Sequence, residues 1–490
     1  MELGQLLVRA KLISVEQMNE ALKRQSGQGG RFGDHVVALG HMSREALDAF
    51  IYKTPVEPES VEATGVDEQE LLTLLMKQIY SERLESTREF ADAIKLPPVI
   101  VAKLVRMATE QKLLYARGVR PDNPAAMNYA LTDEGRRWVN DALQRSQYTG
   151  PAPVTLDQYT ERVSLQKITN EVVTFERVRQ SVTDLVMEDS MIEQSGPALN
   201  SGRAILLYGP SGNGKTTFAM RMANVFADMI YIPYAVVVEG QIIRVFDPSL
   251  HVPITSTSAA GKDTGQSILL SQAVDARWVP CKRPFVVAGG ELTLEMLDLR
   301  YDATSKFYEA PLHMKASGGC FVIDDFGRQL VTPANLLNRW IVPLESRVDY
   351  LKLHTGKSFS IPFDELVIFA TNLAPEELMD PAFLRRMPYK IEIGTPSLEV
   401  YRRIFEKECQ SQGLTLTDEV FDFVVRKVKG EKQLELAAFQ PRFILEQVVA
   451  SCRFSEQAAS LEPRFLNYAI DNLRVRRAVP PRDGAEAAEN

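Results

Sequence analysis

A glycine-rich loop near the middle of the chain has residue types and spacing suited to binding the phosphates of a nucleotide. It follows an apolar run of strand length at 204–208, precedes a helical segment at 218–226, and fits the pattern G-x-x-x-x-G-K-[ST]. Glycines let consecutive backbone N–H groups converge on phosphate oxygens, and the helix N-terminus adds partial positive charge. Lys215 would bridge the β- and γ-phosphates of ATP, and the Thr216 hydroxyl would coordinate Mg²⁺. The predicted ATP-binding loop consists of Gly209, Pro210, Ser211, Gly212, Asn213, Gly214, Lys215, Thr216 and Thr217.

Polar residues end two further apolar strands and could complete a hydrolytic site. The strand 320–323 is followed by Asp324 and Asp325, and the strand 366–371 by Asn372. Asp324 fits the residue that holds Mg²⁺ through water, and Asn372 could orient the attacking water. Asp325 stands where a water-activating glutamate is usual. Because aspartate is shorter, slow turnover or a nucleotide switch is also compatible with this position.

The order of these motifs closely resembles that of the AAA+ ATPases over roughly residues 165–475. After Asn372 come Asp380-Pro381-Ala382-Phe383-Leu384-Arg385-Arg386 and then Gln440-Pro441-Arg442-Phe443, and 316–319 is similar to the MoxR-like and enhancer-activator branches. The resemblance implies a P-loop AAA+ core of the α/β class at 165–395, with a parallel sheet flanked by helices, and an α-helical lid at 396–475. It also implies that Asn372 is sensor 1, that Arg385 or Arg386 is an arginine finger, and that Arg442 is sensor 2.

An arginine finger acts in a neighbouring subunit, so the resemblance implies a homo-oligomer, with a hexamer favoured. Guanidinium groups suit this role because they stabilise charge on a transferring phosphoryl group. Surface salt bridges are the alternative reading of the same arginines. The stretch 236–245 predicts a β-hairpin that could face a substrate, and Phe307 and Tyr308 are either threading aromatics or core residues.

Residues 1–53 contain an internal repeat, since 3–22 and 32–51 each predict a short helix, a turn and a second helix. Ser14 and Ser43 precede the second helices and are suited to cap them. The repeat resembles the N-terminal domain of type II secretion and type IV pilus ATPases, whose tandem motifs can bind cyclic di-GMP. Arg31 matches the family's nucleotide-contacting arginine, whereas Glu2 replaces its counterpart. The alternative is a protein-docking module that binds no nucleotide.

The segment 67–147 predicts three helices, a β-hairpin at about 113–131 and a helix from Asp133, an order that resembles bacterial winged-helix regulators. DNA is a possible partner of this domain, through the third helix and the hairpin. The alternative is protein docking or oligomer contact, because acidic residues dilute the basic ones. The basic residues are Lys103, Arg106, Lys112, Arg117 and Arg120. Segments 54–66 and 148–164 are rich in proline and predict linkers.

The composition is that of an ordinary globular protein, with 490 residues, 45% of them hydrophobic, and a net charge of −8. This charge argues against a chain that coats nucleic acid along its whole length. The four cysteines lie far apart, no apolar run is long enough to cross a membrane, and 476–490 predicts a disordered tail. We therefore expect a cytoplasmic protein.

Two functions from different classes fit these features. The first is an ATP-hydrolysing AAA+ protein that couples nucleotide state to remodelling of a protein partner. The second is a nucleotide-gated regulator that binds DNA through 67–147. A phosphotransfer kinase is disfavoured, because Asn372, the Arg385/Arg386 pair and Arg442 would have no role in it.

Overall fold

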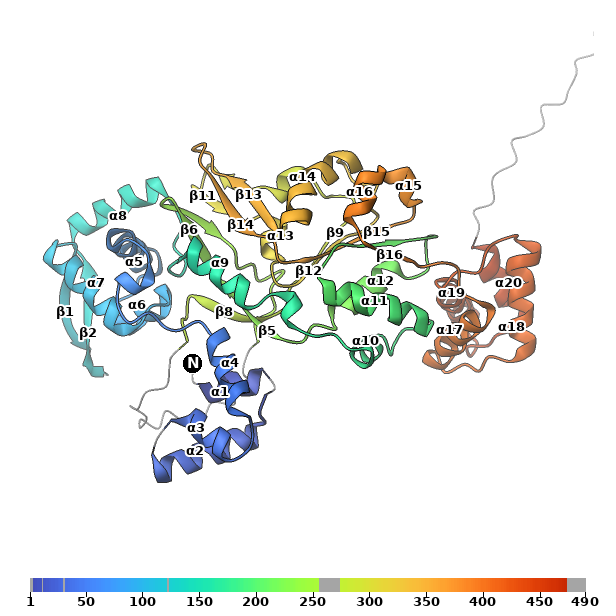
Figure 1. The fold of residues 1–490 in the computed structure, drawn as a ribbon, viewed down its shortest axis with the longest axis horizontal. Helices are drawn as coiled ribbons and strands as arrows, with labels where there is room; N and C mark the ends of the chain where they lie inside the picture. Colours follow the sequence, from blue (N-terminus) through green and yellow to red (C-terminus); the bar gives the residue numbers. More distant parts are fainter. Residues whose placement is uncertain (1–2, 11, 30, 121–122, 255–273, 474–490) are drawn as a thin grey trace, which may run out of the picture.

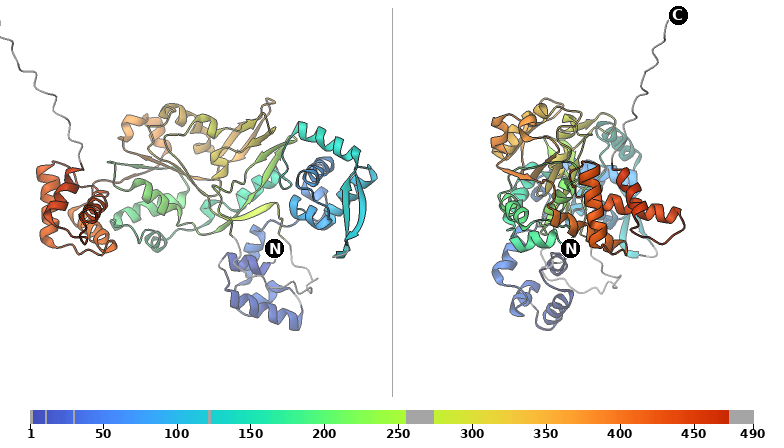
Figure 2. Two further views of the ribbon diagram at one scale, coloured as in Figure 1. Left: turned by 180° about the vertical axis from the view of Figure 1, so that it is seen from behind. Right: turned by 90° about the vertical axis from the view of Figure 1, so that its right-hand side faces the viewer.

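The computed structural model describes residues 3–10, 12–29, 31–120, 123–254 and 274–473. The molecule is elongated, with the helices α5–α8 at one end, the helices α17–α20 at the other, and two sheets between them (Figure 1). The helices α1–α4 project from one side, as the reverse view in Figure 2 also shows. Within the described ranges, no helix has both the length and the apolar character needed to cross a membrane. The predicted tail at 476–490 lies outside the described residues.

A five-stranded parallel sheet forms the centre of the core, in the order β16-β4-β15-β12-β9. Three of its strands are almost wholly buried, as expected for parallel strands covered on both faces. Because all five run in one direction, the residues that follow them meet at a single edge of the sheet. The strands are β4 (Ile205–Tyr208), β9 (Phe285–Ala288), β12 (Cys320–Ile323), β15 (Leu366–Thr371) and β16 (Tyr389–Glu392).

Helices cover both faces of this sheet, so the α/β fold class predicted from the sequence is confirmed. One face packs against residues of α10, α11 and α12, and the other against residues of α14 and α16, with Trp340 fully buried. The helices are α10 (Phe175–Ser181), α11 (Asp189–Ser201), α12 (Lys215–Ala223), α13 (Leu312–Lys315), α14 (Pro333–Ser346), α15 (Pro375–Leu378) and α16 (Pro381–Arg386).

A second five-stranded sheet, in the order β10-β11-β7-β6-β3, is built largely from the insertion between α12 and β12. The predicted hairpin is present, with β6 and β7 joined through Glu239 and Gly240 in left-handed conformations. Tyr308 is buried and Phe307 packs edge-on against Tyr148. Of the two alternatives, both aromatic residues are therefore core residues. The strands are β3 (Val154–Thr155), β6 (Ala235–Val238), β7 (Gln241–Arg244), β10 (Arg300–Asp302) and β11 (Phe307–Glu309).

Two smaller antiparallel pairs complete the strands near this sheet. In one, β5 pairs with β8, and in the other β13 pairs with β14. Buried residues of all four strands belong to the same hydrophobic cluster as β6 and β7. The strands are β5 (Met229–Pro233), β8 (Trp278–Lys282), β13 (Val348–Lys352) and β14 (Ser358–Pro362).

The segment 67–147 folds in the predicted order of three helices, hairpin and helix. Asp67, Ser86 and Thr132 cap three of its helices with their side chains. Its core continues into the second sheet through Ala235 and Val237. The elements are α5 (Glu68–Glu82), α6 (Thr87–Ile94), α7 (Pro98–Glu110), β1 (Leu114–Arg120), β2 (Asn123–Leu131) and α8 (Asp133–Arg145).

The first four helices form the two predicted helical hairpins around a small apolar core. Ser14 makes a capping box with Gln17, and Ser43 caps its helix through the backbone N–H of Ala46. Leu6 joins the cluster of the β5–β8 region, which ties this unit to the rest of the chain. The helices are α1 (Leu3–Arg9), α2 (Val15–Gln28), α3 (Phe32–Ala38) and α4 (Arg44–Lys53).

The segments 54–66 and 148–164, predicted as linkers, contain residues that pack into the folded structure. Val61 and Val66 are buried against α5, and the carbonyl of Pro55 accepts the N–H of Asp275 at 3.0 Å. Residues 154–165 form β3 and helix α9 (Leu156–Leu165), which buries Tyr159. The linker prediction rested on the prolines of these segments. The apolar residues between the prolines pack against residues that are distant in the sequence, which the local pattern does not indicate.

The segment predicted as the lid folds as a separate helical cluster with its own core. A π-helical turn at Arg426–Glu431 follows its second helix. The cluster is continuous with the core through the residues between β16 and α17. Its helices are α17 (Leu398–Ser411), α18 (Asp418–Val425), α19 (Gln440–Phe454) and α20 (Pro463–Asp471).

Asp364, just before β15, predicts a pH-dependent stability. Burial raises its pKa to about 6, although the Ile168 N–H donates to it at 3.1 Å. The folded state therefore binds this proton more tightly than the unfolded chain, whose aspartates titrate near ~3.9. The contribution of protonated Asp364 to the free energy of unfolding is therefore fully present below about pH 4, and it is lost as the pH rises through 6. Asp364→Asn keeps an acceptor for Ile168 and should raise the free energy of unfolding at pH 7.5 by about 1–2 kcal/mol.

Urea unfolding at pH 7.5 and pH 4.5 measures this effect, and the gain should shrink at the lower pH. Asp349→Asn is the matched control, because the pKa of Asp349 is shifted in the opposite direction. Burial alone would raise the pKa of Asp349, but hydrogen bonds from His313 and Arg339 lower it to about 2. Its loss should therefore destabilise the protein at pH 7.5. An Asp364→Asn variant that is less stable than wild type at pH 7.5 would contradict the assignment.

Candidate functional site

The glycine-rich loop joins the carboxyl end of β4 to the first turn of α12, the setting that the sequence predicted. Gly209 has φ +133° and lies against the carbonyl oxygen of Ile393, so the loop touches the segment that follows β16. A side chain at Gly209 would collide with that backbone. Gly212 has φ +82°, a conformation that favours glycine. The loop is therefore shaped by close backbone contacts that residues with a Cβ atom would break.

Lys215 is the buried cation of this loop. Its Nζ donates to the carbonyl oxygens of Gly209 and Pro210, both at 2.9 Å. Burial lowers the pKa of Lys215, and the carboxylates of Asp324 and Asp325 oppose that shift. These contacts hold the ammonium group at the loop itself, beside the N–H groups that open α12.

Thr216 and Asp324 join the loop to the acidic strand. The Thr216 hydroxyl lies 2.9 Å from both carboxylate oxygens of Asp324. A hydroxyl and a carboxylate that converge in this way fit Mg²⁺, which prefers oxygen ligands and takes few of them from the protein. Thr216 and Asp324 would hold the ion, whose chemistry is to neutralise charge on the phosphates.

Asp325 is held in a strained backbone conformation beside Asn372. Its φ is +48°, and its Oδ1 accepts a hydrogen bond from the Asn372 amide nitrogen at 2.7 Å. Its own N–H donates to the Asp324 carboxylate at 3.0 Å. Left-handed backbone costs a residue with a Cβ atom about 1–2 kcal/mol, and such strain gathers at functional sites. The structure thus brings Asp324, Asp325 and Asn372 to one edge, as the strand ends predicted.

Two residues that sequence reasoning missed hold the turn after β12. The Gln329 amide donates to the Asp324 carbonyl at 2.8 Å and accepts the N–H of Gly327 at 2.8 Å. The buried Thr371 hydroxyl donates to the Phe326 carbonyl at 2.8 Å. Only the spacing from Asp324 could have indicated Gln329, because glutamine at a turn carries no distinctive pattern.

The lid contacts the loop directly through the residues that open α19. The N–H of Phe439 donates to the Gly212 carbonyl at 2.9 Å, and the N–H of Ala438 donates to Asn213 Oδ1 at 3.0 Å. The Phe439 ring lies where a Cβ at Gly212 would be. The sequence did not predict this contact.

Arg442 lies one turn further along α19 and is exposed. Its guanidinium pairs with Glu446 at 2.8 Å, and this pairing raises its pKa. An exposed pair of this type is weak, so an anion could displace Glu446 at little cost.

The two candidate finger arginines on α16 have different surroundings. Arg386 pairs with Glu345 at 2.7 Å and lies over the ring of Phe383. Arg385 is exposed. None of the hydrogen bonds described above for the loop, the two aspartates and Asn372 involves Arg385 or Arg386.

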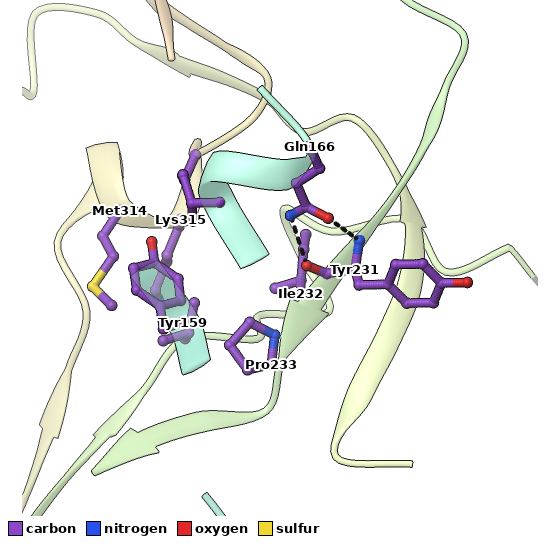
Figure 3. Close-up of a pocket in the computed structure, with 10 residues that line it drawn as sticks. Tyr159, Gln166, Tyr231, Ile232, Pro233, Met314 and Lys315 are labelled. Carbon is purple, nitrogen blue, oxygen red and sulfur yellow. Dashed lines mark hydrogen bonds between the residues drawn. The ribbon is translucent and has the colours of Figure 1, made fainter. Parts of the chain in front are cut away.

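A small pocket is lined by residues of α9 and β5 (Figure 3). The Gln166 side chain forms two hydrogen bonds of 2.9 Å with the backbone of Tyr231 there. The free volume of the pocket is about 10 Å³, which leaves room for one water molecule at most. This pocket is therefore a packing feature and no site for a nucleotide.

Comparisons with known proteins give one family match, over the C-terminal helices, and solved structures of low similarity. A family described as a domain of unknown function (DUF8689) matches residues 397–472. No curated protein matches the chain. NtrX from Brucella abortus matches at 13% identity and a TM-score of 0.34, over 71% of this chain and 63% of its own length. A point mutant of RuvB from Thermotoga maritima matches at 12% identity and a TM-score of 0.32, over 63% of this chain and 73% of its own.

The strain at Asp325 predicts an unusual order of stability among its variants. Asp325→Gly removes the Cβ atom that opposes φ +48°, whereas Asp325→Ala keeps it. Both variants lose the hydrogen bond to Asn372 equally. Asp325→Gly should therefore be more stable than Asp325→Ala by about 1 kcal/mol, measured by urea unfolding. Equal stability of the two variants would show that the backbone there is not strained.

Proposed function

We propose that this chain is a cytoplasmic AAA+ ATPase that couples its nucleotide state to remodelling of a protein partner. The observation that carries the proposal is the meeting of Lys215, Thr216, Asp324, Asp325 and Asn372 at one edge of the parallel sheet. This set supplies a cation for the phosphates, oxygen ligands for Mg²⁺, a carboxylate to activate water and an amide to orient it.

The charges on the segment 67–147 support a protein partner over DNA. Lys103 on α7 pairs with Glu62 at 3.1 Å and with Glu68 at 2.7 Å, and Arg117 on the hairpin pairs with Glu85 at 3.3 Å. These exposed pairs are individually weak, but the glutamates beside the basic residues lower the net positive charge that binding to DNA phosphates requires. Steeply salt-sensitive, ATP-dependent binding of duplex DNA by the full chain would favour the alternative regulator.

Residues 1–53 are assigned to protein docking in this proposal. Arg31, the residue that matches the cyclic di-GMP motif, is exposed at the start of α3. Glu2, which replaces its counterpart in the first repeat, lies outside the described residues. Tight binding of cyclic di-GMP to the full chain in calorimetry would reverse this assignment.

The arginine finger in this proposal is Arg385, and it acts in a neighbouring subunit of a homo-oligomer, most simply a hexamer. Its exposure leaves it available to a neighbour, whereas Arg386 is drawn to Glu345 within its own subunit. Hydrolysis then requires assembly, because each site lacks a cation that the next subunit supplies.

Substitutions in the loop and at Asp325 should separate binding from hydrolysis. Lys215→Ala should weaken ATP binding at least about 100-fold, because it removes the buried charge that meets the phosphates. Asp325→Asn should bind ATP normally but hydrolyse it at least about 100-fold more slowly. Fluorescence titration with an ATP analogue and phosphate release measure the two effects. Lys282→Ala, at an exposed lysine on β8, is the control. Unchanged ATPase activity in both site variants would reject the assignment of Lys215 and Asp325 to the ATP site.

Mixing of inactive variants tests whether Arg385 acts between subunits. Arg385→Ala should keep ATP binding and lose most ATPase activity, since only charge stabilisation in the transition state is lost. Mixed with Lys215→Ala, it should recover part of the activity, because some sites then combine an intact loop with an intact finger. Arg403→Ala, an exposed arginine on α17, is the control. A mixture as inactive as its components would argue that Arg385 acts only within its own subunit.

A further inference from the structure

We propose that Asn213 and Phe439 form a clamp that positions Arg442 over the phosphate loop. This inference rests on the proposed function and adds positioning residues to the same site. It starts from the contact between two segments far apart in the sequence, the loop at 212–213 and the residues 438–439 that lead into α19.

The clamp has three parts that act on the same two residues of the loop. The Asn213 side chain accepts the Ala438 N–H at 3.0 Å, and the Gly212 carbonyl accepts the Phe439 N–H at 2.9 Å. The Phe439 ring covers Gly212 on the side where any other residue would carry a Cβ atom. The ring also packs edge-on against Phe443, which lies on the same helix. The start of α19 is thus fixed to the loop by backbone and side chain together.

The position of Arg442 follows from this attachment. Arg442 is three residues after Phe439, so about one turn of α-helix separates it from the clamp. Its guanidinium pairs with the exposed Glu446 one turn further on, and a pair of this kind is weak enough for the long side chain to turn towards a phosphate. The clamp therefore determines how close Arg442 can come to a phosphate group.

A second set of contacts connects the C-terminal end of α12 to the lid. Lys407 on α17 donates to the carbonyl oxygen of Asp184 at 2.6 Å, and the Asp184 carboxylate pairs with Arg221 on α12. The lid is thereby attached near both ends of α12. Movement of the lid and movement of the loop helix are consequently linked, and Arg442 moves with both.

The test is a double-mutant cycle on ATP hydrolysis by the full chain. Phe439→Ala and Arg442→Ala should each lower kcat/KM for ATP by about tenfold or more, since small misplacements of a transition-state cation are costly. If Phe439 acts through Arg442, the double variant should be no slower than Arg442→Ala alone. Phe439→Tyr, which keeps the ring over Gly212, should restore the wild-type value. Multiplied effects in the double variant would overturn the proposal, because Phe439 would then act independently.

Two controls separate the clamp from general stability and from the proposed function. Phe454→Ala removes the same side chain at the other end of α19, where it is 92% exposed, and should leave kcat/KM unchanged. Hydrogen exchange at the amides of Ala438 and Phe439 reports the clamp without any nucleotide. These amides should be protected in the wild type and exchange faster in Asn213→Ala, and equal exchange in both would overturn the clamp. A wild-type protein with protected amides and no ATPase activity would reject the proposed function instead.

Discussion

The hydrogen bond between Thr216 and Asp324 is the interaction on which the candidate site depends. It joins the helix that follows β4 to the end of β12, two strands that are separated in the sheet by β15. The bond can form only because the three strands are parallel and in register, which brings their carboxyl ends to one level. Asn372, at the end of the intervening strand, then reaches Asp325. One pairing order therefore brings a cation, a hydroxyl, two carboxylates and an amide to the same edge of the sheet.

The same edge of the sheet is where the lid attaches. Ile393, just after β16, lies against Gly209, and Phe439 lies against Gly212. The covalent connection to the lid and its non-covalent contact thus both meet the glycines of one loop. A change in the shape of that loop would therefore reach α17–α20 at two points, Ile393 and Phe439.

The opposite end of the molecule is organised around the second sheet. The core of α5–α8 continues into β6 and β7, and a carbonyl of α8 at Gln144 accepts a hydrogen bond from Lys306 between β10 and β11. Arg277, almost fully buried, pairs with Asp275 and donates to the carbonyls of Thr64 and Pro153. These contacts explain why the two expected linkers are packed segments. A buried cation is tolerated only where carboxylate and carbonyl oxygens surround it, and both segments supply such oxygens.

The sequence by itself determined the local features of this protein. The phosphate loop, the helix caps at Ser14 and Ser43, the Glu239-Gly240 turn and the strands that end in acids all follow from short patterns, because each depends on neighbours within a few residues. Only the tertiary structure decided that Phe439 covers Gly212, that Arg386 is drawn to Glu345, that Lys103 is paired with two glutamates, and that proline-rich segments are buried. These contacts join residues that are distant in the sequence, and their formation depends on packing that no local periodicity encodes.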